Sequence, residues 1–90
     1  MSTAMNFTLT RHAQDELERR SIPVGLLTAV LEQSGQIIPE YGGKKAYQSQ
    51  LDFGGGRIYL LRAIVRDDLD PPRVVTVYRT SKIAKYWRRT

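Results

Sequence analysis

The side chain with the clearest chemical potential in this sequence is His12, the only histidine among 90 residues. An imidazole readily exchanges a proton near neutral pH, so His12 could act as a general base or a general acid. Glu16, Arg19 and Arg20 follow four, seven and eight positions later, which places all four residues on one side of a helix. An ordinary interpretation also exists, in which His12 packs or hydrogen-bonds at a helix end beside weak acid–base pairs.

A second candidate is Arg62, which interrupts an otherwise apolar segment. A guanidinium held on a rigid strand can grip a phosphate through two parallel hydrogen bonds. It can also pair inside the protein, with Glu16, Asp52 or a carbonyl oxygen. In either case a buried arginine requires a partner.

A phenol, a hydroxyl and an ammonium group come together near the C-terminus, at Tyr78, Thr80 and Lys82. Cations and aromatic rings surround them, a composition that suits phosphate contacts and the stacking of nucleic-acid bases. These flanking residues are Arg79, Lys85, Tyr86, Trp87, Arg88 and Arg89. Trp87 also has a simpler interpretation as a hydrophobic anchor, because a very short helix needs packing to form.

The elements that must position these groups begin with two helices. Thr10 can cap a helix over residues 11–20, and residues 21–23 then break the chain, since proline suits a first helical turn. Apolar residues recur at helical spacing between positions 22 and 31. This pattern predicts a second, more apolar helix that ends at Ser34 and Gly35.

Beyond the second helix the apolar period changes from helical to alternating, which predicts a sheet. The expected strands are residues 37–41, 47–53, 57–66 and 74–80. The first should lie at an edge, where Pro39 is tolerated, and the third is apolar on both faces, which is typical of a central strand. Ser81 is expected to cap a final basic helical turn.

These elements predict one α+β domain over residues 1–90. Two N-terminal helices would pack on a three- to four-stranded antiparallel sheet, followed by a short basic C-terminal helix.

Composition narrows the functional classes. The net charge is +5, and residues 71–90 contain six basic residues and no acidic one. A basic end suits a polyanion such as nucleic acid, although it can also act only as a solubilising tail. The lack of cysteine and the single histidine predict a protein without a metal site or other cofactor. No export signal or membrane-spanning segment is evident, so we expect a cytoplasmic protein that does not bind membranes.

Three groups of residues resemble the small bacterial domain-of-unknown-function family four-two-five-eight. They are TRHA at 10–13, RRSIP at 19–23 and, above all, VVTVYRTSK at 74–82 with KYW at 85–87. That family looks like the RelE and BrnT ribonuclease toxins of toxin–antitoxin systems, in which one or two helices precede an antiparallel sheet that binds RNA. The resemblance implies a RelE-like fold, RNA as the substrate and an antitoxin protein as a partner.

The expected activity is therefore that of a toxin that cleaves RNA without a metal ion. Such cleavage needs a base for the ribose 2′-hydroxyl, cations for the developing charge on phosphorus and an acid for the leaving oxygen. His12 would be the base or acid, and Tyr78 a proton donor or stacking surface. The candidates for phosphate stabilisation are Arg19, Arg62 and Lys82, with Arg20 and Thr80 as secondary ones. The flanking C-terminal cations and aromatic rings would bind the strand.

The main alternative is a noncatalytic module that binds RNA, DNA or a partner protein through the same basic surface, and it needs no His12. An antitoxin-like regulator is disfavoured, because neither a DNA-binding helix-turn-helix nor a disordered acidic segment is evident. The RNA sequence recognised, dependence on the ribosome, the oligomeric state and the choice between Arg19 and Arg20 as the residue facing the site stay open.

Overall fold

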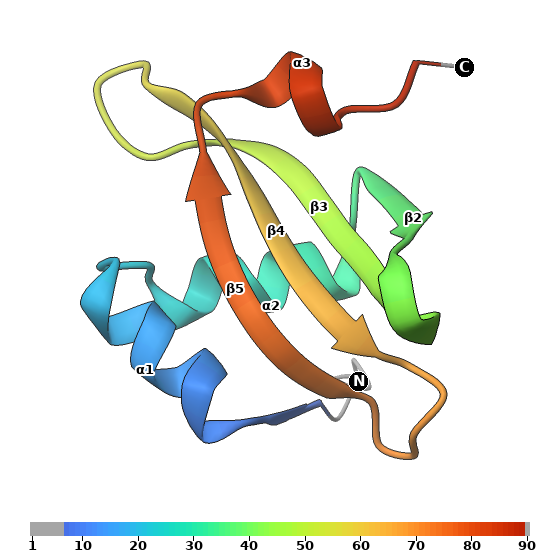
Figure 1. The fold of residues 1–90 in the computed structure, drawn as a ribbon. Helices are drawn as coiled ribbons and strands as arrows, with labels where there is room; N and C mark the ends of the chain where they lie inside the picture. The colour runs from blue at the N-terminus through green and yellow to red at the C-terminus, as the bar shows by residue number, and fades with distance from the viewer. Residues whose placement is uncertain (1–6, 90) are drawn as a thin grey trace, which may run out of the picture.

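A computed structural model describes residues 7–89 as an α+β fold, in which a curved sheet carries two helices on one face (Figure 1). The helices are α1 (Arg11–Arg19), α2 (Val24–Glu32) and α3 (Ile83–Tyr86), with a 3₁₀ turn η1 (Tyr41–Gly43). The strands are β1 (Thr8–Leu9), β2 (Gln36–Pro39), β3 (Lys45–Asp52), β4 (Ile58–Arg66) and β5 (Arg73–Thr80). Among these described residues, no helix is long and apolar enough to cross a membrane.

The sheet has five strands in the order β1-β5-β4-β3-β2, so β4 is central and β2 lies at an edge, as predicted. The prediction of three to four strands, all antiparallel, was wrong because β1 pairs with β5 in parallel. The Thr8 amide donates to the Pro72 carbonyl at 2.9 Å, and the Thr10 amide donates to the Val74 carbonyl at 3.0 Å. A strand of two residues is too short to show an alternating pattern in the sequence. Its pairing depends instead on where the folded chain brings it beside β5.

The first helix begins where the sequence predicts. The Thr10 hydroxyl accepts a hydrogen bond from the Ala13 amide at 3.1 Å and donates to the Val75 carbonyl at 3.2 Å. The same side chain therefore caps α1 and ties the start of this helix to β5. At the other end Ser21 adopts a left-handed φ of 52°, and Pro23 then precedes α2.

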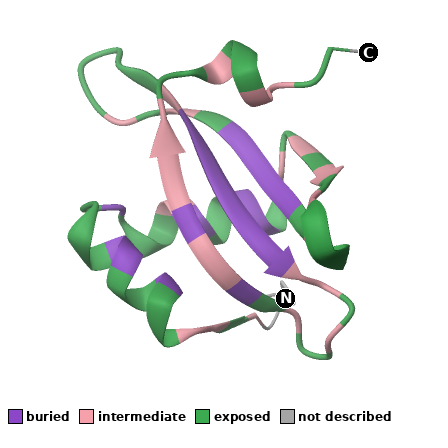
Figure 2. Ribbon diagram, in the orientation of Figure 1, coloured by how far each residue is buried: buried purple, intermediate pink, exposed green. Residues whose placement is uncertain are grey.

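The hydrophobic core lies between the sheet and the two N-terminal helices, and Figure 2 shows that β4 is buried along most of its length. Leu61, Ala63 and Val65 of β4 face the helices and pack with Leu27 and Ala13, among others. Each fully buried aliphatic side chain of this kind contributes roughly 1.5–3 kcal/mol to folding. Because strand residues alternate, Leu60, Arg62 and Ile64 face the opposite side, which we call the open face.

The chain after β5 crosses the open face towards β2. The Gln48 side chain on β3 donates to the Tyr86 carbonyl at 3.1 Å, and the Arg88 amide donates to the Gln36 side chain on β2 at 3.0 Å. The prediction that Trp87 anchors this segment fits its position, because a Cβ atom added at Gly35 would lie only 2.9 Å from the Trp87 ring.

The predicted cap of the last helix was wrong. Lys82 rather than Ser81 precedes α3, and no side chain caps it. The hydroxyl of Thr80 instead accepts a hydrogen bond from the Lys82 amide at 3.0 Å.

Candidate functional site

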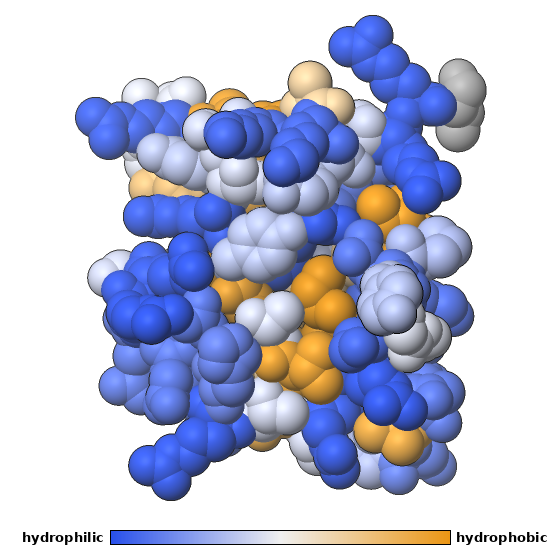
Figure 3. Space-filling model, viewed as in Figure 1, coloured by the Kyte–Doolittle hydropathy of each residue, from blue (hydrophilic) through white to orange (hydrophobic). Residues whose placement is uncertain are grey.

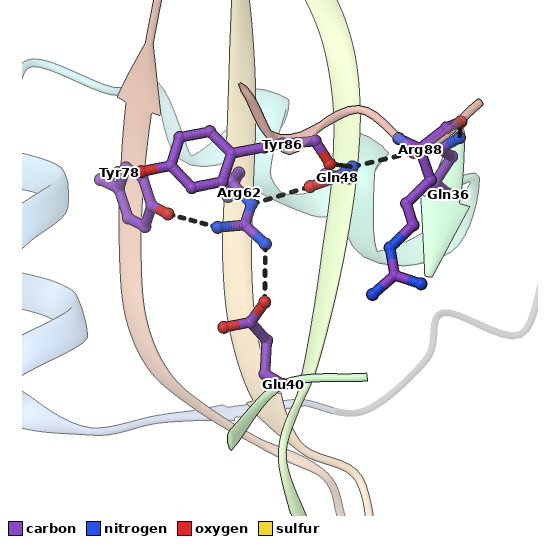
Figure 4. A network of polar contacts seen from close by, with 7 residues as sticks. All are labelled: Gln36, Glu40, Gln48, Arg62, Tyr78, Tyr86 and Arg88. Atoms are coloured by element: carbon purple, nitrogen blue, oxygen red, sulfur yellow. Dashed lines mark hydrogen bonds and ion pairs between the residues drawn. The ribbon is translucent and has the colours of Figure 1, made fainter. Parts of the chain in front are cut away.

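A polar cluster centred on Arg62 occupies the open face (Figure 4). Arg62 donates to the Gln48 amide oxygen at 2.7 Å, to the Tyr78 hydroxyl at 2.5 Å and to the Glu40 carboxylate at 3.0 Å. The ring of Tyr86 lies over the guanidinium, 4.3 Å from its carbon. We call these five residues the Arg62 cluster.

Strand register assembles most of this cluster. Arg62 lies directly opposite Gln48 on β3 and opposite Tyr78 on β5, so the three side chains share one face of adjacent strands. Glu40 comes from the turn after β2, and Tyr86 comes from α3. Four separate segments of the chain therefore converge on one guanidinium.

The burial of Arg62 explains why it needs so many partners. Arg62 is only 2% exposed. Burying a charge lowers the stability of the fold unless the charge is paired and hydrogen-bonded. Within residues 7–89, no buried side-chain nitrogen or oxygen lacks a partner. Arg62 thus pairs internally, as one of the two sequence interpretations allowed, but with Glu40 rather than Glu16 or Asp52.

The two expected carboxylates lie elsewhere for simple geometric reasons. Glu16 is on α1, on the helix side of the sheet, where it pairs with Arg19 and Arg20. Asp52 is at the far end of β3, opposite Ile58, and accepts a hydrogen bond from the Gly54 amide at 2.7 Å. Neither can reach the open face at the middle of β4.

The hydroxyl of Tyr78 has a defined role in its hydrogen bond to Arg62. A guanidinium has no acceptor, so Tyr78 must accept, and its own O–H remains able to donate to another group. Burial raises the pKa of Tyr78, and the hydrogen bond and charge of Arg62 offset this only in part. The phenol is protonated near neutral pH and half-exposed, so its proton can reach a bound group, although burial makes it a weaker acid than a free tyrosine.

A second feature lies on the helix side, at the end of β5. Three arginines and four residues that carry a hydroxyl group line a pocket of about 590 Å³. These residues are Arg19, Arg20, Ser21, Tyr59, Arg79, Thr80 and Ser81. We call this feature the arginine pocket. Both Arg19 and Arg20 contribute to it.

The remaining candidates belong to neither group. His12 is exposed in the first turn of α1, and its ring makes no hydrogen bond or ion pair with another described residue. Lys82, Lys85, Arg88 and Arg89 are exposed along the C-terminal segment. Figure 3 shows that hydrophilic side chains surround a smaller apolar area at the centre of the open face. Within residues 7–89, no three His, Asp or Glu side chains gather closely enough to hold a metal ion.

Sequence reasoning missed Glu40 and Gln48 in the Arg62 cluster, and Ser21, Tyr59 and Ser81 in the arginine pocket. Gln48 carried a usable signal, because alternation within residues 47–53 places it opposite the apolar face of that strand. Glu40 carried none, since its position depends on the turn between β2 and β3.

The fold and these clusters define a small α+β domain with a buried arginine on its open sheet face. A family model described as a domain of unknown function (DUF4258) matches residues 9–79, most of the chain, and the protein belongs to this family. The match includes Glu40, Gln48, Arg62 and Tyr78 but ends before α3. No curated protein matches, and no solved structure matches.

Arg62 should be far more important for stability than an exposed arginine on the same strand. Arg62→Met leaves Gln48 and Glu40 without their shared donor, and we expect the free energy of unfolding to fall by about 3 kcal/mol. The matched control is Arg66→Met. Arg66 pairs with Asp68 in an exposed position, so its loss should cost about 0–1 kcal/mol. Denaturant unfolding of both variants checks this, and equal losses would contradict it.

Proposed function

We propose that the protein is a metal-independent endoribonuclease of the RelE-like kind, the toxin of a toxin–antitoxin pair with an antitoxin protein as its partner. The observation that carries this proposal is the hydroxyl of Tyr78, which accepts a hydrogen bond from buried Arg62 and keeps its own proton for donation. The resemblance to RelE-like toxins and the exposed cations of residues 82–89 add support.

The proposed reaction is an attack of a ribose 2′-hydroxyl on the adjacent phosphate. A bond forms between the 2′-oxygen and phosphorus, and the bond from phosphorus to the next 5′-oxygen breaks. The products carry a 2′,3′-cyclic phosphate and a 5′-hydroxyl. Tyr78 gives its proton to the leaving 5′-oxygen, and Arg62 positions the phenol and stabilises the phenolate that forms.

His12 is the proposed acceptor of the 2′-hydroxyl proton, and Lys82 faces the phosphate charge. The helix that carries His12 starts beside Val75, because Thr10 bonds to the Val75 carbonyl. Tyr78 lies three residues further along β5, which is about 10 Å along the backbone at the usual rise of a strand. The two side chains would have to converge on one phosphate at this edge of β5, because both act on the same step.

A second candidate function is a noncatalytic module that binds RNA. It is favoured by the enclosure of Arg62, because a guanidinium held by Glu40, Gln48 and Tyr78 cannot contact a phosphate directly without losing a partner. The two functions differ in their dependence on the hydroxyl of Tyr78. Binding through exposed cations would not need it, whereas proton donation would.

Expression in a bacterial host tests the proposal. We expect wild type to slow growth, because an unrestrained ribonuclease depletes messenger RNA, and we expect Tyr78→Phe to relieve this effect. Tyr86→Phe is the matched control, since it also removes one phenol from the Arg62 cluster but keeps the ring that covers the guanidinium. Equal growth with wild type and Tyr78→Phe, at equal protein levels, would favour the noncatalytic module.

A further inference from the structure

The arginine pocket is separate from the Arg62 cluster. Val77 belongs to the core on the helix side of the sheet, and alternation along β5 places Arg79 on that same side. Tyr78 points to the open face. The two sites therefore lie on opposite sides of the same strand, and a ligand in the pocket does not compete with one at Tyr78.

Arg79 is oriented by aromatic rings instead of a carboxylate. Its guanidinium carbon lies 4.7 Å from the centre of the Phe53 ring and 5.1 Å from that of Tyr59. Among the described residues, no carboxylate lies within ion-pair distance of Arg79. Stacking on ring faces leaves the N–H groups at the edge of the guanidinium available for an anion.

The other two arginines share one acid. Glu16 is buried and pairs with both Arg19 and Arg20, whose side chains are 69% and 43% exposed. Glu16 does not line the pocket. The three arginines of the pocket carry three positive charges, and Glu16 compensates one of them by pairing with Arg19 and Arg20. The remaining charge of +2 matches the charge of nearly −2 on a phosphomonoester above pH 7.

Ser21 provides a further indication that the pocket is built for a ligand. It lines the pocket while adopting a left-handed φ of 52° just after a helix, where glycine would be free of strain. A serine at this position costs stability relative to glycine but supplies a hydroxyl. Thr80 and Ser81, at the end of β5, also line the pocket.

We propose that the arginine pocket binds a phosphomonoester, specifically the terminal phosphate of an RNA strand. The volume of about 590 Å³ lies within the range of small-ligand sites. The RNA part of this proposal rests on the proposed function. The proposal that the pocket binds a phosphate group rests only on the pocket itself. It can be tested with inorganic phosphate, which has the same charged oxygens and no RNA strand.

The test measures binding rather than cleavage. A short RNA with 2′-O-methyl groups lacks the attacking hydroxyl, so its affinity can be measured in two forms, with a 5′-phosphate and with a 5′-hydroxyl. We expect wild type to bind the phosphorylated form about tenfold more tightly, and Arg79→Gln to lose that preference. Arg73→Gln, an exposed arginine at the other end of β5, should keep it. Ser21→Gly should reduce the preference without lowering stability.

Inorganic phosphate distinguishes binding of the phosphate group alone from binding of a phosphate at the end of an RNA strand. We expect it to shift the amide resonances of Ser21, Thr80 and Ser81 in wild type, and to remove the preference between the two RNAs by competition. Equal affinity for both RNAs, or a preference that Arg79→Gln retains, would overturn the terminal-phosphate site. Neither result depends on cleavage, so a failure of this site is distinguishable from a failure of the proposed nuclease.

Discussion

RNA cleavage should fall about 10²- to 10⁴-fold when Tyr78 is replaced by phenylalanine, the range expected for loss of a general acid. Affinity for RNA should change little, because the exposed cations remain. Tyr78→Phe removes only the hydroxyl group, and with it the proton that would reach the leaving 5′-oxygen. The measurement is the single-turnover cleavage rate of one RNA at saturating protein.

Stability must be controlled in this comparison. Phenylalanine leaves one N–H of buried Arg62 without an acceptor, which should lower the free energy of unfolding by about 1–3 kcal/mol. Rates should therefore be compared at a temperature where circular dichroism shows both proteins to be folded. Tyr86→Phe keeps both the proton of Tyr78 and the ring over Arg62, so it should lose far less activity than Tyr78→Phe. A folded Tyr78→Phe protein as active as wild type would remove Tyr78 from the mechanism.

The second large effect concerns His12. Because its exposed side chain makes no polar contact with the described residues, His12→Ala should change stability by less than about 0.5 kcal/mol. Cleavage should nevertheless fall by about 10²- to 10⁴-fold if His12 accepts the 2′-hydroxyl proton. Single-turnover rates and denaturant midpoints of the same preparations check both statements.

A matched control for His12 is available on the same helix. Asp15 is also exposed on α1, and Asp15→Ala should leave both stability and cleavage almost unchanged. Undiminished cleavage by His12→Ala would show that His12 is not the base, and another residue along β5 would have to accept the proton. A loss of stability instead would indicate a structural role.

Much of the fold was predictable because it depends on local signals. Thr10 caps α1 through its own side chain, and Pro23 restarts the chain before α2. The two apolar faces of residues 57–66 correctly indicated a central strand. Arg62 stood out for the same reason, since a cation among apolar neighbours must find a partner.

The partners themselves depend on long-range alignment, which a single sequence does not display. Glu40 reaches Arg62 only because β2 folds back on β3, and Gln48 and Tyr78 reach it only through the register of three strands. The arginine pocket likewise joins the end of α1 with Tyr59 and Arg79, residues 40 to 60 positions away. The two-residue strand β1 escaped detection because it is too short to show a period.

The central claim is that the side chains of this protein cleave RNA without a metal ion. The most direct test is the rate at which purified wild type cleaves one RNA in excess EDTA, with the product ends identified. We predict an undiminished rate, with 2′,3′-cyclic phosphate and 5′-hydroxyl ends. Abolition of cleavage by EDTA, or no cleavage of free or ribosome-bound RNA under any condition, would contradict the account.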